Sequence, residues 1–396
     1  MDDLLFHGGA LCTPEGYLPR GWLRVAGGRI AALGAGDPPA ERGVRRVDLA
    51  GRILAPGLID VHVHGALGYD TMDATPAALR EMAAYYARHG VTGFLATTVT
   101  APLDEMCAAL DTIAGVMAAD AAGGRPAGAR LLGAHVEGPY LDPERLGAQD
   151  PRHVLKPAPH EFRRLLRPGV TRLLTLAPEA PGNADLIAHA HQQGIVVSAG
   201  HTRATYEEME RAVERGLRHV THLFNGMEPL HHRHPGVVGA ALTLPALTCE
   251  LIADGVHVHP AVLHLAVRAK GIDGIILVTD AMRGAGMPDG RYTLGGLDVT
   301  VRGGEARLAG GNLAGSTLTL ERAVANIMAA TGLALHEALP MATANPARVL
   351  GLGDRRGALV PGYDADLIAL GPGLRVDLTM VGGEIVHRAE EWTLPS

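Results

Sequence analysis

The sequence predicts an α/β protein: a (β/α)8 TIM barrel with a small β-sandwich domain formed from both ends of the chain. Three observations support this fold class. Eight short apolar segments alternate with segments of helical spacing, polar residues stand where the apolar segments end, and both chain ends show short strand patterns joined by glycines. At 396 residues the chain exceeds one ordinary domain, but a single barrel can take up most of it. With 47% hydrophobic residues, a large core can form.

The apolar segments recur from residue 57 to residue 282. They cover 57–65, 93–99, 129–138, 171–179, 194–202, 219–225, 249–257 and 274–282. The segments between them, such as 76–90 and 205–216, have helical spacing and end in glycine, a common helix stop. Short apolar strands that alternate with helices indicate a parallel sheet covered on both faces. Eight units favour a closed barrel over an open doubly wound sheet, and the first strand is not followed by a GxGxxG motif.

The two ends of the chain have a different pattern from the barrel. Short strands joined by glycine turns occur in "GWLRVAGGRIAALG" near the start and in "LTMVGGEIVHRA" near the end. Neither end has enough apolar surface to be stable alone. We therefore expect residues 1–54 and 352–396 to form one β-sandwich domain beside a catalytic barrel of residues 55–351. The glycine-rich stretch 291–316 predicts a hairpin and then a loop over the mouth of the barrel.

Charge and cysteine content narrow the class of protein. A formal net charge of -7 argues against nucleic acid or an anionic membrane as the main partner, and an anionic substrate would need a local basic site. Cys12, Cys107 and Cys249 are far apart, which favours a reducing compartment. No apolar run reaches the roughly 18–20 residues that span a bilayer, and the acidic first residues do not resemble a signal peptide. We expect a cytoplasmic protein.

Metal-binding side chains stand at the ends of several predicted strands. They are His62, His64, Glu137, His201, His222 and Asp280. His62 and His64 share one face because strand side chains alternate, whereas Asp60 below them is expected to be structural. Each residue alone has a structural explanation, such as a turn cap for Glu137 or a helix N-cap for Asp280. Because the functional groups of a barrel gather at the C-terminal ends of its strands, their joint occurrence favours a Zn²⁺ or Fe²⁺ site.

Eight motifs occur in the order seen in one known family. They are "PGLIDVHVHG", "HVEGPY", "AGHT", "THLFNGM", "HHRHPG", "IADGVHVHP", "VTDAM" and "LAGST". In these motifs the chain resembles the N-acetylglucosamine-6-phosphate deacetylases of the amidohydrolase superfamily, and the similarity covers nearly the whole chain. The resemblance implies a barrel with a terminal β-sandwich, a homodimer, and removal of acetate from N-acetylglucosamine 6-phosphate in amino-sugar use and cell-wall recycling.

The resemblance also implies roles for individual positions. Glu137, His201 and His222 match the main metal ligands, and Asp280 matches the catalytic aspartate. His62 and His64 match a second metal position that only some members keep, so one or two ions are expected, with Zn²⁺ preferred over Fe²⁺ or another divalent ion. The positions expected to bind substrate are Ala148, Gln149, Asn225, Gly226, Arg233, His257, Asn312, Leu313 and Ala314.

Within that set, Arg233 matches a phosphate-binding arginine that is thought to reach into the neighbouring subunit's site. Three positions depart from the common pattern of the family: His234 replaces Glu, Gly226 replaces Ala and Gln149 replaces His. These departures affect details of substrate contact more than the class of reaction.

The chemistry of amide hydrolysis agrees with these assignments. A metal ion polarises the carbonyl and lowers the pKa of a bound water to about 7. Asp280 can take the water's proton and return it to the departing nitrogen, and His257 can hydrogen-bond the sugar or the carbonyl oxygen.

Other classes remain as alternatives. A cyclic amidase of the same superfamily would carry a lysine at the end of the fourth strand, where this chain has "TLAPEA". A deaminase would have no use for the basic "HHRHPG" cluster, and a catalytically silent scaffold predicts a lost ligand or a lost Asp280. The sequence does not distinguish the native metal, or the glucosamine from the galactosamine isomer of the substrate.

Overall fold

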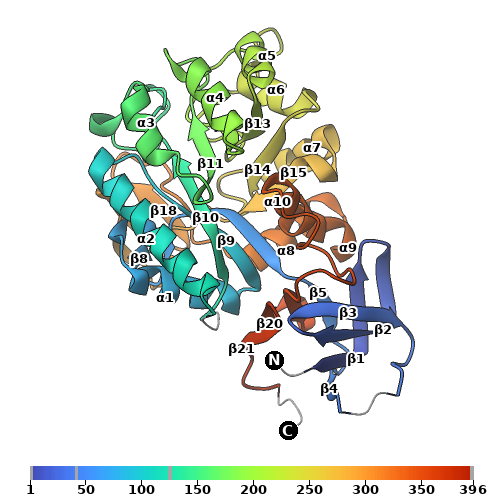
Figure 1. Cartoon of the computed structure of the whole chain (residues 1–396). Helices are drawn as coiled ribbons and strands as arrows, with labels where there is room; N and C mark the ends of the chain where they lie inside the picture. Colours follow the sequence, from blue (N-terminus) through green and yellow to red (C-terminus); the bar gives the residue numbers. More distant parts are fainter. Residues whose placement is uncertain (1–2, 41–42, 124–126, 393–396) are drawn as a thin grey trace.

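The computed structural model describes residues 3–40, 43–123 and 127–392. It consists of a barrel with outer helices and a separate β domain that contains both chain ends (Figure 1). This confirms the fold class predicted from the sequence. Among the described residues, no helix is both long and apolar enough to cross a bilayer.

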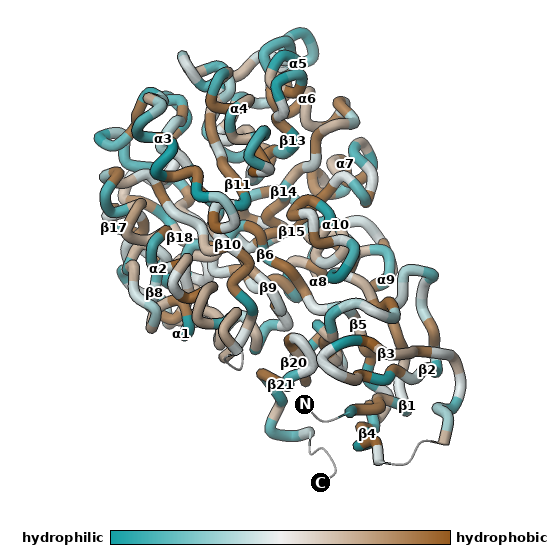
Figure 2. The backbone as a smooth tube through the Cα atoms, viewed as in Figure 1, coloured by the Kyte–Doolittle hydropathy of each residue, from teal (hydrophilic) through white to brown (hydrophobic). Residues whose placement is uncertain are grey.

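Eight parallel strands form the barrel, and each matches one of the predicted apolar segments. They are β6 (Leu58–Val63), β9 (Val91–Thr97), β10 (Arg130–Glu137), β11 (Thr171–Leu176), β12 (Val196–Ala199), β13 (Leu217–Val220), β14 (Thr248–Ile252) and β15 (Ile275–Val278). Figure 2 shows that the hydrophobic stretches gather in these central strands, whereas hydrophilic stretches lie on the outside, for example on helix α5. The strands are apolar because both faces of a barrel strand are covered.

Helices surround the barrel. They are α1 (Pro76–Arg88), α2 (Leu103–Ala121), α3 (Pro159–Leu165), α4 (Asn183–Gln192), α5 (Tyr206–Glu214), α6 (Gly236–Thr243), α7 (Pro260–Lys270), α8 (Leu320–Thr331), α9 (Leu335–Ala338) and α10 (Ala344–Val349). Their starts follow from local sequence: before α5, Thr205 accepts a hydrogen bond from the Glu208 amide (3.2 Å), and the Glu208 side chain accepts one from the Thr205 amide (2.8 Å). Such a reciprocal cap satisfies two amides that the helix leaves unpaired.

The barrel closes where β15 meets β6. At this seam Thr279 donates a hydrogen bond from its Oγ1 to Asp60 Oδ2 (2.6 Å), and the Asp280 amide donates to the His62 carbonyl (2.9 Å). Asp60 is buried. The seam therefore places the residues that follow β15 directly beside those that end β6.

The β domain is one sheet built from both ends of the chain. Its strands are β1 (Leu4–Thr13), β2 (Gly16–Ala26), β3 (Arg29–Ala35), β4 (Arg45–Asp48), β5 (Ile53–Pro56), β19 (Leu367–Leu370), β20 (Val376–Val381) and β21 (Glu384–Arg388). The order is β21-β20-β19-β5-β1-β2-β3, with β4 beside β1. Apolar residues from distant strands, such as Ile30 and Met380, share one core, so the sheet folds over itself as a sandwich does. The predicted boundaries at 54/55 and 351/352 stay a prediction. Residues 1–2, 41–42 and 393–396 of the predicted β domain lie outside the described part.

An excursion follows β15, where the glycine-rich stretch predicts a hairpin, and it has three strands. It comprises β16 (Gly290–Leu294), β17 (Leu297–Arg302) and β18 (Glu305–Leu308). The remaining short elements are β7 (Gly65–Ala66), β8 (Tyr69–Asp70), η1 (Thr71–Asp73), η2 (Pro151–His153), η3 (Ile272–Gly274), η4 (Leu339–Ala342) and η5 (Pro372–Leu374). Leu294 of the excursion reaches the pocket described below.

Candidate active site

Glu137, His201 and His222 bring three metal-binding atoms together at the end of the barrel. Glu137 ends β10, and the two histidines follow β12 and β13. The Nε2 atoms of His201 and His222 each lie 3.2 Å from Glu137 Oε1 and 3.1 Å from each other. All three residues are buried. The structure thus joins three side chains that the sequence placed on three different strands.

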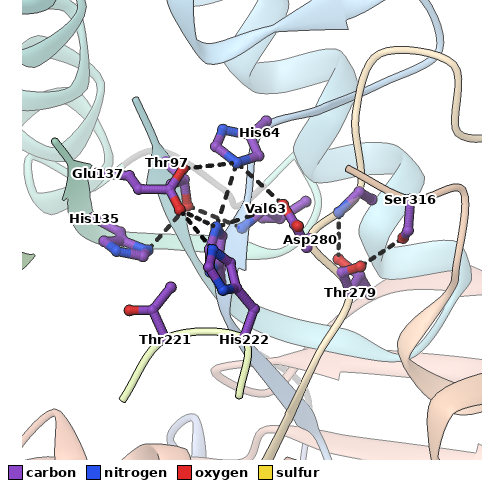
Figure 3. Close-up of polar contacts among 12 residues, drawn as sticks. Val63, His64, Thr97, His135, Glu137, Thr221, His222, Thr279, Asp280 and Ser316 are labelled. Atoms are coloured by element: carbon purple, nitrogen blue, oxygen red, sulfur yellow. Dashed lines mark hydrogen bonds and ion pairs between the residues drawn. The ribbon is translucent and has the colours of Figure 1, made fainter. Parts of the chain in front are cut away.

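A second group shares Glu137 with the first. His62 Nε2 lies 3.3 Å from His64 Nε2, and His64 Nε2 lies 3.5 Å from Glu137 Oε2. Glu137 Oε1 also lies 3.6 Å from His62 Nε2, so the Glu137 carboxylate stands between the two groups. Figure 3 shows Glu137, His64 and His222 directed at a common centre, with Asp280 beside His64. All five predicted ligands meet here.

The donor atoms fit a divalent metal ion. Two ligands held about 2.1 Å from a tetrahedral ion are roughly 3.4 Å apart, close to the spacing of the Glu137, His201 and His222 atoms. The tautomer of His201 also fits, because His201 donates from Nδ1 to the Arg145 carbonyl (2.9 Å), which leaves the Nε2 lone pair directed at the centre.

Asp280 follows β15 and lines the same pocket. Its Oδ1 lies 3.1 Å from His64 Nε2 and 3.5 Å from His62 Nε2. Burial raises the pKa of Asp280, but the neighbouring His62 and His64 outweigh burial and hold this pKa below its usual range. The residue is therefore a carboxylate, the form that accepts a proton.

The pocket above these groups has a volume of about 350 Å³, within the range of small-molecule sites. Its wall includes most of the predicted substrate-binding positions. These are Ala148, Gln149, Asn225, Gly226, His257, Asn312 and Leu313. His257 donates from Nδ1 to Asp254 Oδ2 (2.7 Å), which leaves its Nε2 free for a ligand.

Two predicted positions lie apart from the pocket wall. Ala314 is buried in the small core of the β16–β18 excursion, beside residues such as Val301. Arg233 is exposed and donates from Nη1 to His232 Nε2 (2.7 Å). In a single chain, Arg233 therefore does not contribute its guanidinium to this pocket.

Gln149 reaches the carboxylate of Glu137, which the two groups share. Its Nε2 donates to Glu137 Oε2 (2.7 Å), and its Oε1 accepts from the Thr100 amide (2.7 Å). The Thr100 amide needs an acceptor, so the orientation of the Gln149 amide is fixed. Gln149 thus positions Glu137 in addition to lining the pocket.

Sequence reasoning missed two residues near the centre. Arg145 lines the pocket and forms an ion pair with Glu228. Glu250 on β14 lies beneath the centre and accepts a hydrogen bond from His62 Nδ1 (2.8 Å). A signal for Glu250 was present, because it is the charged residue in the apolar strand segment "TCELI".

Comparisons with known proteins agree with this geometry. The model of the amidohydrolase family matches residues 53–386. An N-acetylgalactosamine-6-phosphate deacetylase of Escherichia coli O157:H7 is 43% identical and aligns over 95% of this chain and 97% of its own length. An N-acetylglucosamine-6-phosphate deacetylase of Bacillus subtilis (strain 168) is 37% identical, over 98% of both chains. A mutant N-acetyl-D-glucosamine-6-phosphate deacetylase of Mycobacterium smegmatis, solved in complex with N-acetyl-D-glucosamine 6-phosphate, superposes with a TM-score of 0.90 at 36% identity, over 98% of this chain and 100% of that one.

Proposed function

Because the chain belongs to the amidohydrolase family, and within it to the group of N-acetylated amino-sugar 6-phosphate deacetylases, we propose that it hydrolyses the amide bond of N-acetyl-D-glucosamine 6-phosphate with a divalent metal ion. The products are D-glucosamine 6-phosphate and acetate, and the reaction serves amino-sugar catabolism and cell-wall recycling. The observation that carries the proposal is the Glu137–His201–His222 group, which opens into the same pocket as Asp280.

N-acetylgalactosamine 6-phosphate is a second candidate substrate. A relative named for that sugar is 43% identical to this chain, at least as similar as the relative named for the glucosamine isomer. The two sugars differ at one hydroxyl group, so the pocket must distinguish them by a single hydrogen-bonding position.

Glu137, His201 and His222 would hold one metal ion, and His62 and His64 would hold a second together with Glu137. When bound, such an ion polarises the acetyl carbonyl and lowers the pKa of a water to about 7. Imidazole and carboxylate ligands suit Zn²⁺ first and Fe²⁺ as the alternative.

Asp280 moves the proton that the reaction requires. As a carboxylate it can accept a proton from the attacking water and later donate it to the departing nitrogen, because an amine leaves poorly unless it is protonated. Its contact with His64 (3.1 Å) holds the carboxylate over the mouth of the barrel.

His257 and the excursion loop orient the sugar. The Asp254 carboxylate holds His257 with Nδ1 protonated, so Nε2 can accept a hydrogen bond from a sugar hydroxyl. Asn312 and Leu313 also line this pocket, and in this proposal they enclose the acetyl group.

Arg233 binds the phosphate from the neighbouring subunit of a homodimer. The support for this proposal is that Arg233 is exposed and lies outside the pocket of its own chain. A guanidinium presents a planar fork that fits phosphate oxygens.

The small-molecule substrate and the net charge of -7 agree with a cytoplasmic enzyme that binds neither nucleic acid nor membrane.

An acetate-release assay tests the function. The purified protein, loaded with Zn²⁺, is offered the 6-phosphates of N-acetylglucosamine and N-acetylgalactosamine, the two unphosphorylated sugars and, in a separate hydrolysis assay, a cyclic amide. Metal content is measured in parallel. Release of acetate from a phosphorylated sugar with at least one bound ion per chain is the expected result. Hydrolysis of a cyclic amide but of none of the sugars would favour the cyclic amidase alternative. If neither the sugars nor the cyclic amide are hydrolysed, the catalytically silent scaffold is favoured.

A further inference from the structure

Glu250 is a buried carboxylate that lies beneath the two metal-binding groups. The proposed reaction gives Glu250 no role. It lies on β14 and has no exposed surface. A carboxylate is costly to bury unless its oxygens are paired or hydrogen-bonded. The hydrogen-bond partners of Glu250 therefore indicate its role.

The partners of Glu250 are residues of the candidate site. Its Oε2 accepts hydrogen bonds from His62 Nδ1 (2.8 Å) and from the His222 amide (3.0 Å). Its Oε1 lies 3.2 Å from His219 Nε2, and the other ring nitrogen of His219 lies 2.6 Å from Thr248 Oγ1. One oxygen thus joins a histidine of the second group to the main chain of a histidine of the first.

The hydrogen bond to His62 determines the tautomer of this ring. A neutral imidazole carries one N–H, and a carboxylate at Nδ1 keeps the proton on that atom. The lone pair is then on Nε2, which lies 3.3 Å from His64 Nε2 and 3.6 Å from Glu137 Oε1. A carboxylate partner also makes the imidazole a stronger ligand.

We propose that Glu250 is a positioning residue that holds His62 ready for the second metal ion, and that it strengthens the binding of this ion. The inference rests on the proposed function, because it takes the Glu137–His201–His222 group as the first metal site. Its effect is selective: Glu250 contacts the ring of His62, but it contacts His222 only through the main-chain amide.

The test compares Glu250→Leu and Glu250→Gln with the wild-type chain. Each protein is stripped of metal and titrated with Zn²⁺, bound metal is counted by elemental analysis, and the Co²⁺-loaded forms are compared by visible absorption. The wild type should bind two ions per chain. In Glu250→Leu the Kd of the second ion should rise by about 10- to 100-fold, the usual effect of losing such a partner. Glu250→Gln should restore part of this affinity, because its carbonyl oxygen still accepts from His62 Nδ1.

Asp377→Asn is a matched control for the loss of a buried carboxylate. Asp377 lies on β20 of the terminal sheet, has no exposed surface and accepts hydrogen bonds from the Nε atoms of Arg52 and Arg375 (2.7 Å each). This variant should unfold at a lower temperature but still bind two ions with wild-type Kd values.

Four other results would each contradict the proposed role of Glu250. A wild type that binds no ion would overturn the proposed function and this inference with it. A wild type that binds one ion while releasing acetate would overturn only the inference. An unchanged second Kd in both Glu250 variants, or an equal loss at both sites, would also overturn it. If Glu250→Leu fails to fold by circular dichroism, Glu250→Gln decides, and an unchanged second Kd would then refute the role.

Discussion

Replacing Asp280 by asparagine separates proton transfer from metal binding. The main chain at this position is anchored independently of the carboxylate: the Asp280 amide donates to the His62 carbonyl (2.9 Å), and its carbonyl accepts from the Ser316 amide (2.7 Å). Asp280 has φ of 49°, a left-handed conformation that asparagine also tolerates. Asp280→Asn should therefore fold, with a loss of unfolding free energy of about 0.5–3 kcal/mol, because it removes a buried charge beside His62 and His64.

The expected loss is catalytic. An asparagine has nearly the same size and shape as aspartate, but it cannot take up the proton of a water. General acid–base catalysis contributes about 10²- to 10⁴-fold, so kcat should fall by that factor, equivalent to roughly 2.7–5.4 kcal/mol at 1.36 kcal/mol per tenfold. The KM for the sugar phosphate should change little.

The assay is acetate release at saturating substrate, with metal content and thermal unfolding measured on the same samples. Asp377→Asn is the control, because Asp377 is also a buried aspartate but its partners are Arg52 and Arg375 of the terminal domain. A kcat near the wild-type value would remove Asp280 from the proton transfer. A loss of kcat that paralleled loss of metal would show that Asp280 acts chiefly as a ligand.

Three further changes test other parts of the structure. Glu137→Gln should release metal, because it removes the carboxylate shared by both groups, and unchanged metal content by elemental analysis would contradict the site. Arg233→Ala should raise the KM for the 6-phosphate sugar by about 10- to 100-fold and leave the unphosphorylated sugar nearly unaffected; equal effects in steady-state kinetics would show another role. Arg356→Met should cost about 3–5 kcal/mol of unfolding free energy in urea titrations, because it leaves the buried Asp366 without its cationic partner, whereas Asp364 keeps its ion pair with Arg355; a loss below about 1 kcal/mol would show that Asp366 finds another partner.

Most of the fold could be predicted because a barrel strand is apolar along its whole length. Segments such as 57–65 and 274–282 therefore stand out against the amphipathic helices between them. The seam of the barrel could not be predicted in the same way. It depends on Asp60 and Thr279, which are more than two hundred positions apart and whose hydrogen bond no periodicity reveals.

In the candidate site too, some residues could be predicted from the sequence, whereas other contacts depend on tertiary structure. Ligands such as His62 and Glu137 could be predicted because polar residues at the ends of apolar strands are conspicuous. Gln149 was predicted to contact substrate, but its bond to Glu137 depends on how a loop returns over the barrel, which local sequence does not specify. The place of Arg233 outside its own pocket depends on tertiary structure, and its proposed contact depends on a second chain.

The backbone has an unusual conformation just after three of the barrel strands, and the pattern of side chains in the sequence does not reveal it. His201, His222 and Asp280 have φ values of 49°, 31° and 49°, in the left-handed region that side chains other than glycine seldom adopt. Each such residue costs of order 1–3 kcal/mol and persists only where its surroundings hold it. Here the surroundings do so: the His222 amide donates to Glu250 (3.0 Å), the His201 carbonyl accepts from the Asp142 amide (2.9 Å), and Asp280 is bonded on both sides. Since all three side chains reach the same pocket, we infer that the chain turns sharply at these strand ends to direct them toward one centre.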